Sequence, residues 1–424
     1  MVGIRDSSYL SVALKAEQWL QSMRLDKDNQ ELAWRTVQDS KLVSTDLYSG
    51  TSGIVLFYLE LFTVTKDSTY LQKAEQGLQY IISTTPETWR PDKIGLYTGA
   101  CGLAFVTNEF YRISGKSLYQ KHSRLLLERV QTMIQQDFVH TFLANDIMSG
   151  YAGIGLTMLY ASKYNVLPDA LKIASSIGNV LLSRALQVTG EKNSSSLRWS
   201  MYMSDTARKA YLPNFSHGTA GVCYFLAQLY ETTKERRFLD AALKGASHLA
   251  SITNDSGWIY HAEPTGKDRY YLSWCHGPAG TARLYYKLFT ITGDTVWKQK
   301  IVVAARAMMQ CGIPTKKTSG YWNNVGFCCG DAGVVSFFLH LYQQFGSKEY
   351  QVFSNEVLSH LLQSASVQNS GLAWIHAENR RQPSFVYAQT GFMQGASGIG
   401  WTLLQAHLAT QHKMPQILLP DNPF

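Results

Sequence analysis

The sequence predicts an all-α protein, an α/α toroid of seven helical-pair repeats with an inner and an outer ring of helices. Two observations predict it. A Gly-x-x-Gly motif occurs seven times at intervals of 49 to 68 residues, and a long apolar segment follows each copy. The motifs begin at Gly50, Gly99, Gly150, Gly218, Gly277, Gly330 and Gly395. Because the repeat runs through the whole chain, we expect a single domain over residues 1–424.

The segments after the glycines predict the inner helices. Residues 54–62, 222–230 and 334–342 are apolar nearly all round and too long for typical strands. The outer helices are predicted from apolar stripes at helical spacing, such as Leu239, Ala242, Leu243, Ala246 and Leu249. Each glycine is expected to start an inner helix, where the missing side chain permits positive φ and close backbone approach.

Composition and charge narrow the classes of protein. Hydrophobic residues make up 45% of the 424 residues and charged residues 17%, so the chain can bury a large core. The net charge of +8 is scattered, which argues against a nucleic-acid partner. Residues 1–23 mix charged and apolar residues, which predicts an amphipathic helix and not a signal peptide. We find no transmembrane segment, since no stretch reaches roughly 18 uncharged apolar residues, and expect a cytoplasmic protein with reduced cysteines.

Three of the six cysteines precede the glycine motifs of two successive repeats. The fifth repeat reads Trp-Cys-His-Gly at 274–277, and the sixth reads Phe-Cys-Cys-Gly at 327–330. Zinc prefers about four ligands, thiolate sulfur among them, and a catalytic site leaves one position open. If the two repeats are neighbours, Cys275, Cys328 and Cys329 meet at one rim and can hold Zn²⁺. The remaining cysteines are expected to be small core residues: Cys101, Cys223 and Cys311.

These motifs together resemble the lanthionine cyclase (LanC-like) family, which includes bacterial lanthipeptide cyclases and eukaryotic relatives. The likeness rests on Trp-Cys-His-Gly-x-x-Gly, on Cys-x-Gly-x-x-Gly some fifty residues later, and on the seven repeats, and it covers nearly the whole chain. It implies that Cys275, Cys328 and Cys329 bind zinc and that a substrate cysteine enters the open position as thiolate. The thiolate would add to the β-carbon of dehydroalanine or dehydrobutyrine in a dehydrated precursor peptide and form a thioether.

The resemblance also implies two catalytic residues. His217, directly before Gly218, would protonate the α-carbon of the enolate that the addition leaves, a task that suits a side chain titrating near neutrality. Asp146, four residues before Gly150, would orient an imidazole or activate the incoming thiol. The structural alternatives stay open, namely a histidine that caps a helix or is hydrogen-bonded in the core, and an aspartate that caps a helix or a loop.

The sequence departs from the pattern of the bacterial cyclases at three positions. Cys329 stands where histidine is usual, and the extra thiolate predicts a weaker Lewis acid but a more nucleophilic bound thiolate. Tyr271 replaces an arginine of the bacterial cyclases, and Arg269 lies two residues earlier. His276 stands where bacterial cyclases often have tyrosine, and here the sequence resembles the eukaryotic relatives. Tyr271, Arg269 and His276 are candidate lining residues, and a helix-capping role for His276 is the alternative.

Three functions compete. The leading hypothesis is a lanthionine cyclase that acts on a dehydrated precursor peptide made by a separate dehydratase, with residues 191–203 as one candidate for leader-peptide binding. The second, suggested by the eukaryotic relatives, is glutathione addition to dehydrated residues of damaged proteins. The third is a non-catalytic, zinc-stabilised peptide-binding toroid in which His276 supplies the fourth ligand.

Other α/α toroids rank below these three. A glycosidase would need paired carboxylates at the rim, and only Asp146 and Asp331 stand near the glycine motifs. Both a free-standing cyclase and a cyclase domain of a larger synthetase are compatible with this sequence.

Overall fold

The computed structural model describes residues 8–27, 30–38, 40–140, 143–188, 196–207 and 209–424. The chain divides into two compact units. The first unit comprises Met1–Glu87, Val106–His122 and Gly312–Leu418. The second comprises Thr88–Phe105, Ser123–Cys311 and Leu419–Phe424. The single domain expected from the repeat stays a prediction.

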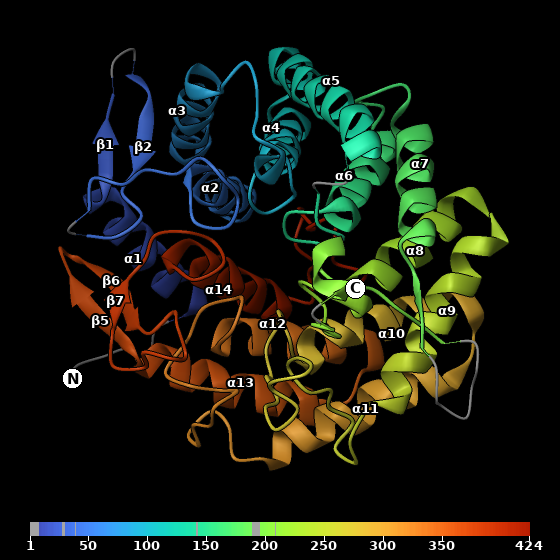
Figure 1. Ribbon diagram of the computed structural model, residues 1–424. Coiled ribbons are helices and arrows are strands. Elements are labelled where there is room, and N and C mark those ends of the chain that lie inside the picture. The colour runs from blue at the N-terminus through green and yellow to red at the C-terminus, as the bar shows by residue number, and fades with distance from the viewer. Residues whose placement is uncertain (1–7, 28–29, 39, 141–142, 189–195, 208) are drawn as a thin grey trace. The chain divides into compact units, whose positions relative to one another are not determined.

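The described residues are mainly helical, as predicted, and the helices come in pairs (Figure 1). The helices that follow the glycine motifs are α2 (Thr51–Thr65), α4 (Ala100–Ser114), α6 (Tyr151–Lys163), α8 (Thr219–Thr233), α10 (Pro278–Thr292), α12 (Asp331–Phe345) and α14 (Ala396–Thr410). The second helices are α3 (Ser68–Thr84), α5 (Ser117–His140), α7 (Ala170–Ser183), α9 (Arg236–Ser251), α11 (Thr295–Gln310) and α13 (Lys348–Gln363). The last motif helix, α14, packs against α1 (Tyr9–Ser22) from the other end of the chain.

The two kinds of helix differ in burial as the sequence predicts. Helix α8 is buried along almost its whole first three turns, whereas α9 buries a stripe that includes Phe238, Leu239, Ala242 and Leu249. Helix α1 likewise buries one side, with Val12, Ala16 and Leu20, so the amphipathic N-terminal helix is confirmed from Tyr9 onward. A helix that is apolar all round belongs inside a protein, and one with a single stripe covers it.

Each motif helix begins directly after its first glycine, and close backbone contact explains the glycine. A Cβ atom on Gly218 would lie 1.6 Å from the carbonyl oxygen of Leu212, and one on Gly277 would lie 2.4 Å from the carbonyl carbon of Leu272. The expectation of positive φ is wrong, because φ is −138° at Gly218 and −115° at Gly277. Glycine is therefore required by the preceding loop, which leaves no room for a side chain, and not by a left-handed backbone.

Short antiparallel sheets lie in the connections. The first unit holds β1 (Arg24–Asp26) with β2 (Leu32–Trp34), and a sheet in the order β5 (Ala365–Gln368), β6 (Gly371–His376) and β7 (Tyr387–Ala388). The second unit holds β3 (Leu186–Gln187) with β4 (Leu197–Arg198). Within the described ranges, none of the helices combines the length and apolarity needed to cross a membrane.

Candidate metal and catalytic centre

The loops before the glycine motifs are joined by backbone hydrogen bonds between equivalent residues. In the second unit, the amide of Ser216 donates to the carbonyl of Cys275 at 2.9 Å. In the first unit, the amide of Cys328 donates to the carbonyl of Met393 at 2.8 Å, and the amide of Met393 donates to that of Tyr48 at 2.9 Å. Each of these five residues stands two positions before its glycine. Cys275 and Cys328 therefore hold the same structural position in their repeats.

His217 and Asp146 form a histidine–carboxylate pair in the second unit. Nδ1 of His217 lies 2.6 Å from Oδ2 of Asp146, which is fully buried, while the imidazole is partly exposed. The other oxygen, Oδ1, accepts a hydrogen bond from the amide of Ser149 at 3.0 Å. Asp146 thus caps its own loop with one oxygen and contacts the imidazole of His217 with the other. Because Nδ1 is engaged, Nε2 is the ring nitrogen left for exchange with a ligand.

Further rings gather beside His217. The ring centroid of His276 lies 5.6 Å from that of His217, 5.4 Å from that of Tyr271 and 4.6 Å from that of His261. Burial, and then the neighbouring His261 and His217, lower the pKa of His276 well below its usual range, so this imidazole is neutral at physiological pH. Tyr271 belongs to this ring cluster, whereas Arg269 is joined to it through its backbone carbonyl, which accepts from the amide of His261 at 2.7 Å.

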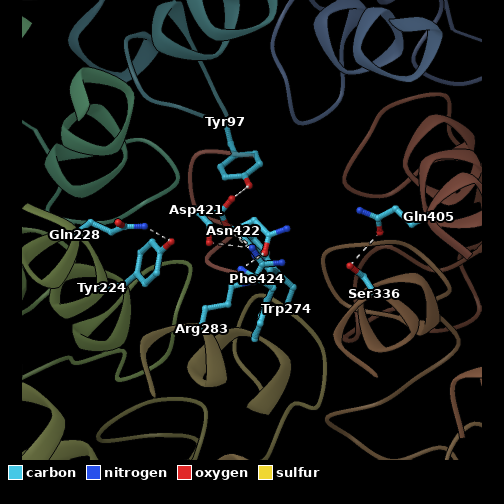
Figure 2. A network of polar contacts seen from close by, with 10 residues as sticks. All are labelled: Tyr97, Tyr224, Gln228, Trp274, Arg283, Ser336, Gln405, Asp421, Asn422 and Phe424. Carbon is cyan, nitrogen blue, oxygen red and sulfur yellow. Dashed lines mark hydrogen bonds and ion pairs between the residues drawn. The ribbon is translucent and has the colours of Figure 1, made fainter. Parts of the chain in front are cut away.

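Trp274, directly before Cys275, is anchored by a buried carboxylate from the last segment of the second unit. Asp421 accepts hydrogen bonds from the indole of Trp274 at 3.0 Å and from the hydroxyl of Tyr97 at 2.9 Å, and Figure 2 shows how these groups converge. Arg283 balances the charge, with Nη1 at 3.2 Å from the carboxylate. Since all four side chains are buried, the network fixes the peptide that carries Cys275.

In the first unit, Cys328 and Cys329 lie beside polar residues from the loop before α14 and the loop before α2. Nε2 of Gln394 lies 3.6 Å from Sγ of Cys329 and donates to the hydroxyl of Tyr48 at 3.1 Å. Its oxygen accepts from Asn324 at 3.0 Å, which orients the amide group toward the sulfur. Burial, followed by charge on Cys328 and Cys329, raises the pKa of Tyr48 well above its usual range. Tyr48 is therefore a neutral phenol.

The three candidate zinc ligands are cysteines, so each offers a sulfur atom to a metal ion. Cys275, Cys328 and Cys329 form a group of thiols that could hold a metal ion. An all-sulfur donor set is one that zinc and other borderline or soft metals prefer. The residues present therefore fit a thiolate-bound metal.

The other cysteines are free thiols as well, and two behave as predicted. Cys101 and Cys223 are fully buried, and burial raises the pKa of Cys101 to about 12, as is typical of inert structural thiols. Cys311, also expected in the core, is only partly buried because it lies just after the end of α11.

Two other sequence expectations concern residues outside this centre. Asp331, the second carboxylate near a glycine motif, is occupied within the first unit, where it accepts from the hydroxyl of Tyr321 and lies 2.6 Å from Nδ1 of His360. Residues 189–195, which include the start of the predicted leader-binding segment, lie outside the described residues.

Sequence reasoning missed four residues of the centre. Gln394 and Tyr48 stand one and two positions before a first glycine, as Cys329 and Cys328 do, so alignment of all seven motifs would have found them. His261 and Asp421 follow no repeat and carry no such signal. Their place follows from the folding of loops that the motifs do not describe.

Comparison with known proteins identifies the family. The family model described as lanthionine synthetase C-like protein matches residues 41–419. The chain belongs to this family. Lacticin 481/lactococcin biosynthesis protein LcnDR2 of Lactococcus lactis subsp. lactis is 24% identical over 392 residues, which are 89% of this chain but only 37% of that protein. Glutathione S-transferase LANCL1 of Danio rerio is 22% identical over 303 residues, 70% of this chain and 69% of that protein.

The solved structures that resemble this lanthionine synthetase C-like chain include a cyclase and a glycosidase. Nisin cyclase aligns with a TM-score of 0.66 at 17% identity and covers 93% of both chains. An inactive variant of the α-1,6-mannanase of Salegentibacter sp. HEL1_6 aligns with a TM-score of 0.53 at 12% identity and covers 95% of this chain and 99% of the mannanase. The predicted fold class, an α/α toroid of helical pairs, is thereby confirmed, and function must be argued from the site.

Proposed function

We propose that this protein is a zinc-dependent lanthionine cyclase, which joins a peptide cysteine to dehydroalanine or dehydrobutyrine through a thioether. Cys275, Cys328 and Cys329 would hold the ion. When bound, zinc would lower the pKa of a substrate thiol and so supply a thiolate at neutral pH. Family membership and the nisin cyclase fold support this proposal.

One observation carries the proposal, the place of the His217–Asp146 pair beside a candidate metal ligand. His217 directly follows Ser216, whose amide is bonded to the carbonyl of Cys275. The imidazole is tethered through Nδ1 and is partly open to solvent. A proton donor next to a thiol-binding position is what addition across a dehydrated residue requires.

We assign the proton transfers to His217. Attack of sulfur on the β-carbon forms the carbon–sulfur bond and moves the π-electron pair of the alkene toward the α-carbon and the adjoining carbonyl. The thiol loses one proton and the α-carbon gains one, so a single residue can relay it. His217 would donate this proton from Nε2, while Asp146 holds the ring in one tautomer and stabilises its protonated form.

We assign lining roles to the rest of the ring cluster. Tyr271 and the neutral His276 would form the wall beside His217, and Arg269 would hold that wall through its bond to His261. The peptide substrate must already contain dehydrated residues. We propose that a separate dehydratase makes them, since the cyclisation step itself creates no alkene.

A thiol-consumption assay tests this function. A synthetic peptide with one cysteine and one dehydroalanine is incubated with zinc-loaded protein, and the remaining thiol is alkylated and counted by mass spectrometry. With wild-type protein the peptide thiol should be consumed, so that no alkylated peptide remains and the fragment spectra show a thioether. Cys275→Ala and His217→Asn should leave the thiol free. Equal alkylation with and without wild-type protein would contradict the proposal.

A second candidate is glutathione addition, favoured by the similarity to the protein named glutathione S-transferase LANCL1. The same assay, run with glutathione and a cysteine-free dehydroalanine peptide, separates the two by the mass of the adduct. A purely structural zinc would instead need a fourth protein ligand, with His276 as the nearest sequence neighbour. In that case His276→Ala would release the metal, and neither adduct would form.

A further inference from the structure

The first unit contains an open groove of about 900 Å³ that the proposed chemistry does not use. It runs between residues 36–38 and 42–44 on one side and the sheet of β5, β6 and β7 on the other. Its apolar lining includes Val37, Leu42, Val43, Ile375, Phe385 and Val386. A volume of this size is typical of sites that take up small molecules or a short stretch of peptide.

The groove exposes large apolar side chains to solvent. Leu42 and Phe385 are each 64% exposed, and Ile375 is 42% exposed. A group of such residues in one concave surface indicates a binding site, whereas single ones are ordinary. Among the described lining residues, Glu378 is the one charged side chain, and its carboxylate accepts from the hydroxyl of Tyr387 at 2.9 Å.

One end of the groove lies close to the candidate metal ligand Cys329, with Tyr48 and Gln394 between them. Tyr48 and Ser49 line it and occupy the two positions before Gly50. The hydroxyl of Tyr48 accepts from Gln394, whose amide nitrogen lies 3.6 Å from Sγ of Cys329. A ligand at this end of the groove would therefore contact Tyr48, which is hydrogen-bonded to Gln394, the residue beside the thiol of Cys329.

The walls of the groove suit an extended chain. Val37 and Gln389 form an antiparallel bridge at one side, and the amide of Thr390 donates to the carbonyl of Thr36 at 3.1 Å. Strand β7 is an edge strand of its sheet, with β6 as its partner. Edge strands commonly receive peptides in extended form.

We propose that this groove binds an extended apolar segment of the dehydrated peptide substrate, adjacent in sequence to the cysteine that reacts. The inference rests on the proposed function, because Tyr48 at the end of the groove is linked through Gln394 to Cys329, which would help to hold the zinc that takes up that cysteine. Charge argues for this occupant over glutathione, whose carboxylates would face Glu378 with no basic lining residue to offset the repulsion.

Binding to metal-free protein tests the proposal separately from catalysis. The probe is a fluorescein-labelled dehydroalanine peptide with one cysteine and several leucines, and anisotropy reports its Kd on the full chain without zinc. Leu42→Ser and Phe385→Ser should each weaken binding about tenfold, since each removes one large apolar contact. Val352→Ser on α13 is the matched control, because Val352 is 66% exposed and lies outside the groove; it should leave Kd unchanged.

Four outcomes overturn the groove proposal, and a fifth concerns the proposed chemistry alone. An unchanged Kd in both groove variants rejects the site. If the two variants weaken binding of a probe whose leucines are replaced by serine as much as they weaken binding of the leucine probe, apolar recognition is rejected. Displacement of the probe by glutathione, or a wild-type dimer that Phe385→Ser dissociates in sedimentation, assigns the groove to another occupant. A protein that binds the probe through the groove but forms no thioether rejects the proposed chemistry alone, so the two failures are distinguishable.

Discussion

Oδ2 of Asp146 lies 2.6 Å from Nδ1 of His217, while the other oxygen of the same carboxylate caps its own loop. One buried side chain thus fixes two loops that come from different repeats. A carboxylate that holds an imidazole by one nitrogen fixes its tautomer and makes its protonated form easier to reach. Loss of the charge should therefore affect the reaction more than the fold.

Asp146→Asn should lower the rate of thioether formation about a hundredfold, which is the usual scale of general acid–base assistance. Zinc content and the melting temperature should change little, because asparagine can still accept the hydrogen bond from Ser149. Single-turnover cyclisation of the synthetic peptide measures the rate.

Asp46→Asn is the matched control for Asp146→Asn. Asp46 caps the equivalent loop of the first repeat, where Oδ1 accepts from the amide of Ser49 at 2.7 Å and the next residue is Gly50. It should leave the rate unchanged. An equal loss of rate in both variants would show that loss of a carboxylate charge from such a loop slows the reaction without any contact to His217.

Asp421→Asn should weaken zinc binding about tenfold or more, because the indole bond at 3.0 Å holds the peptide next to Cys275 and residues that position metal ligands commonly contribute this much. The same variant should increase the alkylation rate of Cys275 in metal-free protein. Competition with a chromogenic chelator measures the zinc affinity.

Glu109→Gln is the control for Asp421→Asn, since it also removes a buried carboxylate that pairs with an arginine, Arg112, at 2.6 Å. It should lower stability without changing zinc affinity. If Glu109→Gln weakens zinc binding as much as Asp421→Asn, general loosening of the fold explains the loss and Asp421 has no positioning role.

The structural features that could be predicted are those encoded by the repeated sequence pattern. The start of α8 at Gly218 follows from a pattern that occurs seven times, and so does the shared position of Cys275 and Cys328. Of the two reasons predicted for the glycine, close backbone approach is confirmed and positive φ is wrong. The close contact is with the carbonyl of Leu212, six residues earlier, and it depends on how the loop folds.

What does not repeat was beyond prediction. Asp421 and Trp274 are 147 residues apart, and nothing in either segment signals their hydrogen bond. The groove is similar, since its walls come from residues 36–38 and 42–44 and from the segment of β5 to β7, which lie far apart in sequence and have no alternating apolar pattern. Contacts of this kind follow from tertiary packing and not from local periodicity.

Cys329→His should retain zinc but slow the addition step. A third thiolate donates more charge to the ion than an imidazole does, which leaves a bound substrate sulfur more nucleophilic. Rates are compared at saturating zinc, so that a difference in affinity cannot mimic a difference in reactivity. Faster addition by Cys329→His would reverse the assigned role of the extra thiolate.

Glu60 on α2 supplies a test of stability against pH. Burial raises its pKa from the ordinary 4.5 to about 7, although the amides of Gln416 and Ile417 oppose this effect. Between these values the folded protein keeps a proton that the unfolded chain releases. The contribution to the free energy of unfolding is therefore full below pH 4.5 and is lost as the pH rises toward 7, by about 3 kcal/mol in all.

Glu60→Gln replaces the titrating carboxyl with a neutral amide, so the variant has no proton to release at this position. The variant should therefore gain stability relative to wild type as the pH increases from 4.5 to 7, with the difference constant on either side of that window. Urea unfolding at a series of pH values measures both proteins under the same conditions. Since Glu60 lies outside the candidate zinc and proton-transfer residues, thioether formation at neutral pH should be unaffected. A stability difference that does not vary with pH would show that Glu60 is already ionised in the folded protein, so that the amides of Gln416 and Ile417 outweigh its burial.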